Sequence, residues 1–466
     1  MSSEHSARTV DRIQQHLVEY ASRLTFENIS PQAVHAAKAF TMDTLGVLVS
    51  GFCYEPCRMA RNVAAAMPCE GGATIVGSRM KATLDMAAFV NATTARYTEA
   101  NDVYARYKPG CTHGHPSDVI MPLLSVAEHA NSNGREFITS VVLAYEVYMT
   151  LCDLVHNHGF DSSTFGCAAI ALAAGRLLGL SNEQIAHAVS MAVVPNNILN
   201  QVRQSHVTMW KAVAAGKAGQ AGVFAAMLAQ AGMEGPHLPF EGKAGWCAHI
   251  AKEELALELR GGTGEQFLIM QSRIKPRPAR ALTMGSILAA EKLTGRVGGV
   301  ENVRSVTVEV HQQAARGTGE HHSHPDTRET ADHSIPYMVA AVLMKGTITP
   351  HSYDDSMLWN PQLRALMPRI KVVESDEYTR AFEGTPQQYR ARVTVVTQSG
   401  ETLSAEGGGD SDDLAAPKSD EQVAAKFRGC AEDMLGSRRS NALLERLWNL
   451  DRMVDVAELP PQFVLA

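Results

Sequence analysis

Residues 212–233 read AVAAGKAGQAGVFAAMLAQAGM, a stretch built almost entirely from alanine, glycine and a few larger apolar residues. Residues 165–180 have a similar composition. Helices made of such small side chains can approach one another closely, so they belong in a packed interior. Both stretches are therefore predicted to be buried helices that form the scaffold of the fold.

The rest of the first half of the chain also reads as successive helices. Residues 9–23 carry apolar side chains at helical spacing. A serine followed by proline, the residue favoured at the first helical position, predicts a helix over residues 31–51. A Ser-Asn-Glu start predicts another over residues 181–194. We therefore expect residues 1–265 to be all-helical.

The pattern changes after residue 262. Alternation of apolar and polar residues predicts strands over residues 303–310 and 392–397, and a weaker one over residues 370–373. Helical patterns occupy residues 334–345, 419–435 and 440–448. The predicted fold is therefore mainly α, with a large all-helical domain of residues 1–265 plus 406–466. A smaller α+β domain of residues 266–405 is predicted to be inserted into it.

Composition excludes several classes of protein. The chain has 466 residues, 45% of them hydrophobic, and a net charge of −7, which argues against a nucleic-acid partner. The longest uncharged run, residues 184–202, contains a histidine, a proline and several amides, so we expect no membrane span. The N-terminus lacks the apolar core of a secretory signal, and the eight cysteines form no CxxC pair. We expect a cytoplasmic protein.

Residues 99–118, EANDVYARYKPGCTHGHPSD, form the loop richest in ionisable groups. His115 precedes what looks like a helix start, with Ser117 or Asp118 near the cap. A helix N-terminus lowers the proton affinity of a nearby imidazole and attracts anions. His115 is therefore a candidate acid/base group beside a carboxylate pocket. The alternative is an ordinary surface histidine in a turn.

Metal and nucleotide sites have little support in the sequence. His113-Gly114-His115 and residues 321–324 (HHSH) are the candidate metal ligands, but neither has helical i,i+4 spacing or cysteine partners. The chain has neither a GxGxxG after a strand nor a phosphate-binding GxxxxGK[ST] motif. The sequence therefore gives little support to a metal site or a nucleotide cofactor.

Two segments offer cations for an anionic ligand. Lys211 lies at the start of the small-residue helix, where the helix dipole disfavours a cation unless a carboxylate lies beside it. Residues 273–280, RIKPRPAR, present four cations near the predicted domain boundary, where clefts form. The alternatives are a surface lysine and a solvated linker. Residues 328–337, RETADHSIPY, are predicted to cap the helix that follows them.

Taken together, these segments resemble the MmgE/PrpD family. The resemblance rests on MDTLGVLVSG, on the EAND and GHPSD motifs, on the helix opening MWKAVAAGKAGQAG, on IKPRPAR and on TRETADHSIPY. The last motif looks most like the 2-methylcitrate dehydratase branch. The resemblance implies an all-helical domain with an α+β lid, a homodimer, and activity without metal or organic cofactor.

The resemblance also implies roles for single residues. It places His115 on the family's active-site histidine, Lys211 and Lys275 on substrate-contacting lysines, and Tyr337 on a tyrosine at the cleft. Several positions depart from the family pattern, two of them in its acidic motif. Glu99 stands where the family has the first aspartate of its acidic motif, and the aromatic after it is lost.

The other departures lie at positions where relatives carry histidine. Asp161 stands in one of them, and Arg280 stands where the decarboxylases have a second histidine of the lid. Arg273 is a further candidate for substrate binding. The fold prediction is insensitive to these changes, whereas the exact substrate depends on them.

The resulting hypothesis is a metal-independent hydro-lyase that dehydrates a hydroxy-tricarboxylate such as 2-methylcitrate. His115 would handle the proton next to a carboxylate, and Glu99 or Asp102 would orient it or act as the second acid/base group. Tyr337 would donate a proton to the leaving oxygen. Alternatives are a cis-aconitate-type decarboxylase, an iminodisuccinate-type epimerase, or a non-catalytic protein that binds di- or tricarboxylates.

Overall fold

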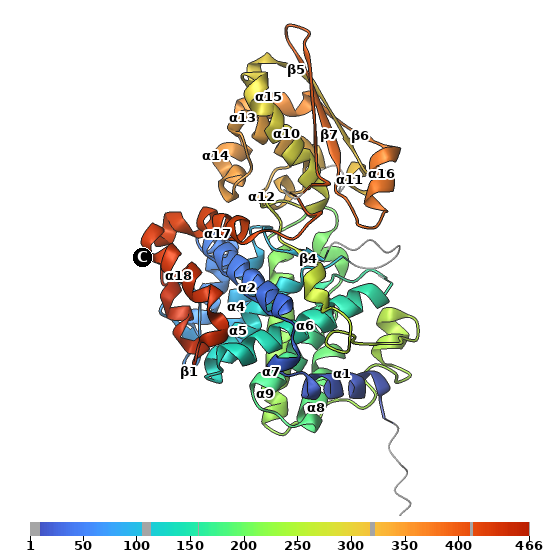
Figure 1. Ribbon diagram of the computed structural model, residues 1–466, viewed down its shortest axis with the longest axis vertical. Coiled ribbons are helices and arrows are strands. Elements are labelled where there is room, and N and C mark those ends of the chain that lie inside the picture. Colours follow the sequence, from blue (N-terminus) through green and yellow to red (C-terminus); the bar gives the residue numbers. More distant parts are fainter. Residues whose placement is uncertain (1–9, 105–112, 157, 317–321, 411–412, 466) are drawn as a thin grey trace, which may run out of the picture.

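A computed structural model describes residues 10–104, 113–156, 158–316, 322–410 and 413–465. The chain is mainly helical, as the sequence predicts. Figure 1 shows a larger part made of helices and, at one end of the long axis, a smaller part that contains a β-sheet. The N-terminal and C-terminal helices both lie in the larger part.

The larger part is a stack of helices whose ends agree closely with the sequence signals. Its α-helices are α1 (Arg12–Arg23), α2 (Pro31–Gly51), α3 (Glu55–Ala65), α4 (Leu84–Arg96), α5 (Ile120–His129), α6 (Gly134–Leu154), α7 (Ser163–Leu177), α8 (Asn182–Val193), α9 (Trp210–Gln230), α17 (Asp420–Leu435) and α18 (Ser437–Trp448). Helix α2 starts at the proline that the sequence indicated, after the capping side chain of Ser30. Helix α8 has the predicted capping box at Ser181.

The small-residue helices lie in the centre of this stack, as predicted. Helix α9 packs against α4 and α7. A β-carbon at Gly216 of α9 would lie 2.1 Å from the hydroxyl of Thr93 in α4, which no side chain could tolerate. Glycine is therefore required where these two helices cross.

Two helices, α6 and α9, are long and apolar enough to cross a membrane by length and composition alone. Neither helix was expected from the sequence to be apolar enough for a membrane span, because each contains charged residues. In the fold, 89% of the most apolar window of α6 and 61% of that of α9 are buried inside the protein. Packing against other helices accounts for their apolar character.

The smaller part contains a sheet of four strands in the described residues, in the order β6-β5-β7-β8. Its strands are β5 (Val303–Val310), β6 (Ile370–Glu374), β7 (Ala391–Thr397) and β8 (Thr402–Gly407). Strand β5 runs parallel to β6 and antiparallel to β7, and β8 is antiparallel to β7. Strand β8 was not predicted, because Leu403 is the one large apolar residue in TLSAEG.

Helices surround this sheet and connect its strands. They are α10 (Met284–Val297), α11 (Gln312–Ala315), α12 (Arg328–Ala331), α13 (Ile335–Lys345), α14 (Asp355–Leu358), α15 (Pro361–Leu366) and α16 (Asp376–Phe382). Helix α10 packs on β7 and β8, and α13 packs on α10. Ser334 caps α13 by accepting a hydrogen bond from the backbone of Tyr337, which confirms the predicted capping role of this segment.

The two parts have separate hydrophobic cores. One cluster of buried residues draws on residues 13–274 and 423–463, and the other on residues 279–414 together with Val103. Two short antiparallel strand pairs complete the described strands: β1 (Pro68–Thr74) pairs with β2 (Lys81–Ala82), and β3 (Val103–Tyr104) with β4 (Ser272–Arg273). The second pair joins the loop after α4 to the segment that leads into the smaller part. The insertion of residues 266–405 as a lid remains a prediction.

Candidate active site

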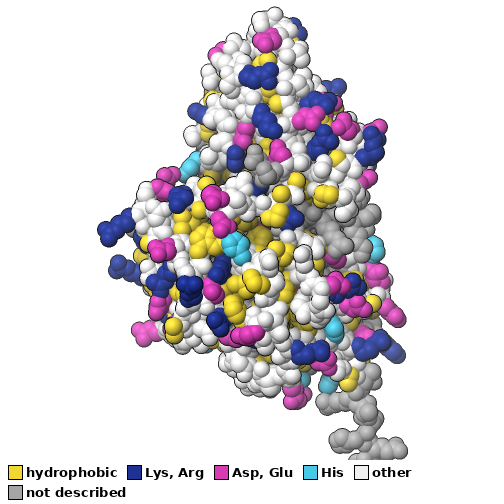
Figure 2. All heavy atoms as spheres, in the orientation of Figure 1, with side chains coloured by type: hydrophobic (Ala, Val, Ile, Leu, Met, Phe, Trp, Pro, Cys, Tyr) yellow, Lys and Arg dark blue, Asp and Glu magenta, His cyan; other side chains and the backbone are white. Residues whose placement is uncertain are grey.

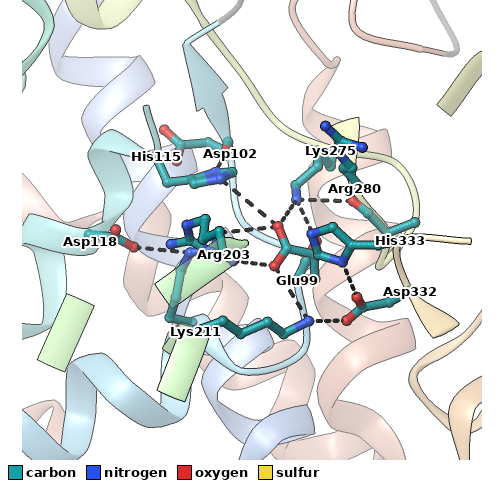
Figure 3. Close-up of polar contacts among 12 residues, drawn as sticks. Glu99, Asp102, His115, Asp118, Arg203, Lys211, Lys275, Arg280, Asp332 and His333 are labelled. Atoms are coloured by element: carbon teal, nitrogen blue, oxygen red, sulfur yellow. Dashed lines mark hydrogen bonds and ion pairs between the residues drawn. The ribbon is translucent and has the colours of Figure 1, made fainter. Parts of the chain in front are cut away.

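Glu99 is the centre of a buried cluster of charged side chains just beyond the end of α4 (Figure 3). Its backbone has a φ of 56°, in the left-handed region that glutamate rarely adopts. Its carboxylate receives a two-point hydrogen bond from the guanidinium of Arg96, with N–O distances of 2.9 and 3.1 Å. The surrounding structure therefore holds this carboxylate in one orientation, at the cost of local backbone strain.

Two lysines from distant segments also face Glu99. Lys275 Nζ lies 3.2 Å from Glu99 Oε1 and donates to the carbonyls of Glu99, at 2.5 Å, and Ala279, at 3.1 Å. Lys211 Nζ, at the start of α9, lies 3.8 Å from Glu99 Oε2 and pairs with Asp332. The side chain of Lys211 is only 1% exposed, which excludes the alternative of a surface lysine.

The charges in this cluster alter one another's proton affinities. Burial alone would raise the pKa of Glu99, but Arg96, Lys275 and Lys211 outweigh burial and hold the pKa well below its usual value. Burial lowers the pKa of Lys275 to about 8, although Glu99 opposes this shift. Glu99 is therefore ionised at neutral pH, and Lys275 is an unusually acidic ammonium group.

His115 is held in one tautomer by the backbone. Its Nδ1 lies 2.7 Å from the carbonyl oxygen of Asp102, and a carbonyl can only accept, so Nδ1 carries the proton. Its Nε2 lies 3.9 Å from Glu99 Oε1. Burial, followed by the charges of Arg96 and Lys275, lowers the pKa of His115 well below its usual value. A neutral imidazole with an unprotonated Nε2 therefore faces the cluster.

The local structure at His115 differs from the prediction. Residues Pro116–Val119 form a short 3-10 helix before α5, and His115 occupies its N-cap position without a side-chain cap. Neither Ser117 nor Asp118 caps a helix. The low proton affinity of His115 arises from burial and neighbouring cations rather than from a helix dipole.

Asp102 holds the loop around His115 in place through its carboxylate. Its Oδ1 accepts from the backbone N–H of Ser117 at 3.1 Å, and its Oδ2 accepts from the hydroxyls of Ser272, at 2.7 Å, and Tyr145, at 3.0 Å. Burial raises its pKa. Asp102 thus orients His115 through its carbonyl, while its carboxylate joins β4 and α6 to the loop.

Asp161, another predicted site residue, is already paired within the chain. Its carboxylate forms an ion pair with Arg203 and accepts from the backbone and hydroxyl of Ser163, at 3.0 and 2.7 Å. Burial would raise the pKa of Asp161, but Arg203 outweighs it and lowers the pKa. The charge of Arg203 also contributes to the low pKa of His115, so Asp161 acts on the site through Arg203.

Several members of the cluster were missed by the sequence analysis. They are Arg96, Asp118, Arg203, Asp332 and His333. Burial raises the pKa of Asp118 to about 7, although Arg96 Nε lies 3.7 Å away. Asp332 and His333 lie inside the TRETADH motif, so the motif could have indicated them. In the structure, Asp332 pairs with both Lys211 and His333 Nδ1. Arg203 belongs to no motif that the sequence analysis identified.

The structure does not bring Tyr337 and Arg273 into this cluster. The hydroxyl of Tyr337 donates to the carbonyl of Ser352 at 2.7 Å, and its ring stacks on Tyr353 in the core of the smaller part. The guanidinium of Arg273 donates to the carbonyls of Met270 and Ser272. Both polar groups are thus occupied by backbone contacts.

Arg280 lies beside the cluster and behaves differently from the lysines. Figure 3 shows it next to Lys275 and His333. Burial lowers its pKa to about 10, against the charge of Glu99. Its Nη1 is buried without a hydrogen-bond partner in the described part of the chain. Arg280 is therefore a cation close to Glu99. Among the described residues, no carboxylate accepts a hydrogen bond from its side chain.

The TRETADH motif also joins the two parts of the molecule. The guanidinium of Arg328 lies 3.9 Å from the ring centroid of Tyr54, and Tyr97 donates to Glu329 at 2.8 Å. Both tyrosines belong to the larger part, whereas the motif belongs to the smaller part. The motif thus contacts the larger part through stacking, a hydrogen bond and the ion pair with Lys211.

The candidate metal ligands do not form a site in the described residues. No group of three or more His, Cys, Asp or Glu side chains suited to a metal ion occurs among them. The ring of His113 lies 6.4 Å from that of Phe382. His321, like residues 105–112, lies outside the described residues. Activity without a metal or cofactor remains a prediction.

Comparison with known proteins identifies the family. Residues 15–258 match the MmgE/PrpD N-terminal domain, and residues 278–450 match the MmgE/PrpD C-terminal domain. The chain is 24% identical to the mitochondrial 2-methylcitrate dehydratase of Yarrowia lipolytica, over 85% of this chain and 78% of that protein. It is 25% identical to the 2-methylcitrate dehydratase of Cupriavidus necator, over 83% and 82%.

A relative named for another activity is nearly as similar. The cis-aconitate decarboxylase-like protein oryM of Aspergillus oryzae is 24% identical, over 84% of each chain. Identities of this size leave the substrate open. With both of its domains matched over most of its length, the chain belongs to the MmgE/PrpD family.

Proposed function

We propose that this protein is a hydro-lyase that dehydrates a hydroxy-tricarboxylate such as 2-methylcitrate without a metal ion. The observation that carries the proposal is the neutral imidazole of His115, whose unprotonated Nε2 faces Glu99 at the centre of the buried charged cluster. Relatives named 2-methylcitrate dehydratase favour this reaction over others of the family.

In the proposed reaction, His115 Nε2 takes a proton from the carbon next to a substrate carboxylate. The electrons of that C–H bond move onto the carboxylate, which then carries two negative charges. Lys211, Lys275 and Arg280 stabilise this species, and fixed charges in a site that excludes water lower such a barrier by several kcal/mol. The C–O bond next breaks as the double bond forms.

The leaving hydroxyl needs a proton to depart as water. The sequence motifs suggested Tyr337 for this step, but its hydroxyl donates a hydrogen bond to the carbonyl of Ser352. We assign it instead to the ammonium group of Lys211, whose side chain hydrogen-bonds only Asp332 among the described residues. Glu99 and Asp332 lie beside this ammonium group. After the transfer, the proton on His115 can return to Lys211.

The proposal also includes a moving lid and a dimer. Residues 266–405 would close over the cluster, with the TRETADH contacts as the closed state. Figure 2 shows apolar side chains gathered near the middle of one face, over the region of α2 and β4, which supports a homodimer. The cytoplasmic location remains a prediction.

The test is product analysis with four acids: 2-methylcitrate, citrate, cis-aconitate and iminodisuccinate. NMR would show an unsaturated tricarboxylate after dehydration, loss of a carboxyl group after decarboxylation, or inverted configuration after epimerisation. We expect dehydration of 2-methylcitrate. Release of CO2 from cis-aconitate instead would favour the activity for which the Aspergillus oryzae relative is named.

Two variants test the role of His115. His115→Ala should reduce turnover by about 100-fold or more, the usual contribution of a general base. The matched control is His249→Ala, because His249 is exposed and its backbone N–H donates to the carbonyl of Gly245, outside the cluster. Near-normal turnover by a folded His115→Ala protein would refute the assignment, and binding of the acids without any product would indicate a non-catalytic binding protein.

A further inference from the structure

Three buried side chains beside the Glu99 cluster have nitrogen atoms without hydrogen-bond partners. These atoms are Nη1 of Arg280, both ring nitrogens of His311 and both ring nitrogens of His322. His311 is 1% exposed and His322 is 8% exposed. Buried polar atoms in native proteins are almost always paired, because an unpaired one has lost its water without compensation. Several such atoms in one place therefore indicate a polar occupant.

Other contacts fix the three residues without using these atoms. The backbone N–H of Arg280 donates to the carbonyl of Asp332 at 3.1 Å. The hydroxyl of Ser334 donates to the carbonyl of His322. The ring of His311 stacks on Phe382, with the ring centroids 3.9 Å apart and the planes nearly parallel. Stacking thus positions the ring of His311, whereas the contacts of Arg280 and His322 position their backbones.

The charge of Arg280 relates the three groups to one another. Burial, followed by this charge, lowers the pKa of His311 to about 3 and that of His322 to about 4. Both imidazoles are therefore neutral at neutral pH, and each offers one N–H donor and one acceptor. Arg280 offers donors only. A ligand that satisfies all three must accept hydrogen bonds with negative charge and also donate one.

The neighbouring cations suggest which part of a ligand binds here. Lys211 and Lys275 are already paired with carboxylates of the chain, whereas Arg280 is not. The charges of Arg280 and the Glu99 carboxylate nevertheless interact. The group of Arg280, His311 and His322 therefore borders the cluster around His115. A carboxylate that carries a hydroxyl on the adjacent carbon has the required acceptors and donor.

We propose that Arg280, His311 and His322 form a subsite that binds the hydroxyl-bearing carboxylate end of the substrate. The inference rests on the proposed function and assigns two histidines to substrate recognition that neither the motifs nor the comparisons indicated. Arg280 binds the carboxylate. The acceptor nitrogen of one imidazole receives the proton of the substrate hydroxyl, and the N–H donors bind substrate oxygens. The subsite thereby selects acids that carry a hydroxyl.

Citrate and tricarballylate provide the test, because they differ only in the hydroxyl of citrate. Isothermal titration calorimetry of the full-length protein should give a Kd for citrate lower by about tenfold or more, since a site built to bond a hydroxyl rejects ligands without it. The His311→Phe/His322→Leu double variant, which keeps the ring stack on Phe382, should bind both acids with similar Kd values. Arg280→Met should weaken both by about tenfold or more.

His237→Leu is the matched control, because His237 is exposed, and it should leave both Kd values unchanged. If the double variant does not fold, His322→Asn alone should reduce the preference for citrate. The inference is overturned if the wild type binds citrate and tricarballylate with equal affinity. It is also overturned if a folded double variant keeps the preference for citrate. Either result would mean that water alone occupies the subsite. If the protein binds neither acid and forms no product from the four acids named above, the proposed function itself is wrong.

Discussion

The Glu99 cluster and the group of Arg280, His311 and His322 lie side by side but treat buried charge in opposite ways. In the first, the cations Arg96, Lys211 and Lys275 are matched by carboxylates of the chain. In the second, Arg280 forms no ion pair with a carboxylate of the described residues, although single atoms such as Nε of Arg96 lack a hydrogen-bond partner in the first group too. The contrast teaches that burial alone does not mark a ligand site. A buried cation whose partners are missing is the better indicator.

The largest effect should follow from removing a matched cation. Lys275→Met leaves Glu99 and two backbone carbonyls without their donor, and loss of one partner from a buried pair typically costs about 3–5 kcal/mol. Urea denaturation should show a decrease of that size in the free energy of unfolding. Lys371→Met, at an exposed position of β6, should change it by less than about 0.5 kcal/mol. Equal behaviour of the two variants would remove the distinction between the regions.

The unmatched group should be visible in the pH dependence of stability. The folded-state pKa values of His311 and His322, about 3 and about 4, lie below the usual value of 6.5. The unfolded chain therefore binds more protons below pH 6.5, and stability decreases as the pH falls from there towards 4. Each histidine contributes a slope of up to about 1.4 kcal/mol per pH unit.

The His311→Phe/His322→Leu variant isolates this contribution. Its free energy of unfolding, measured by urea denaturation across this pH range, should fall less steeply than that of the wild type. The slope will not vanish, because burial also lowers the pKa values of His115 and His333. Parallel pH profiles for variant and wild type would show that the two histidines are not buried as described.

A smaller effect is expected where the two parts of the molecule meet. Tyr97→Phe removes the hydrogen bond to Glu329 and leaves that carboxylate, 4% exposed, with one donor fewer. The expected loss is about 1–3 kcal/mol in the free energy of unfolding. Tyr54→Phe is the comparison, because the Tyr54 hydroxyl makes only long contacts of 3.1 and 3.4 Å and should matter less. A larger loss for Tyr54→Phe would contradict this ranking.

The smallest effect on stability should come from Arg280→Met. Replacing a buried polar group that lacks a partner by an apolar one is close to neutral or stabilising. The free energy of unfolding should stay within about 1 kcal/mol of the wild type, while citrate binding weakens. A loss comparable to that of Lys275→Met would show that Arg280 has an internal partner after all.

Much of the fold was predictable because its signals are local. The helix over residues 31–51 and the strand over residues 303–310 were predicted with the observed bounds. Proline at a helix start and alternation along a strand act within one element, so neighbouring residues suffice to recognise them. Strand β8 escaped because its pairing with β7, rather than its composition, makes it a strand.

The candidate site was predictable only in part. His115, Lys211 and Lys275 could be named from motifs, and they do lie around Glu99. Arg203 and His311 could not, because nothing close to them in the sequence indicates their partners. Tyr337 shows the converse: a motif residue whose hydroxyl the fold directs to a backbone carbonyl.

The sequence by itself determined that the chain is mainly helical, that small residues line its central helices, and which cations and carboxylates are available. Only the tertiary structure decided which charges neutralise each other, which ring nitrogen of His115 is protonated, and which nitrogen atoms remain unpaired. The physical reason is distance. Helix periodicity acts over a few residues, whereas electrostatic pairing depends on separations of a few ångströms between residues far apart in the chain, and packing sets those separations.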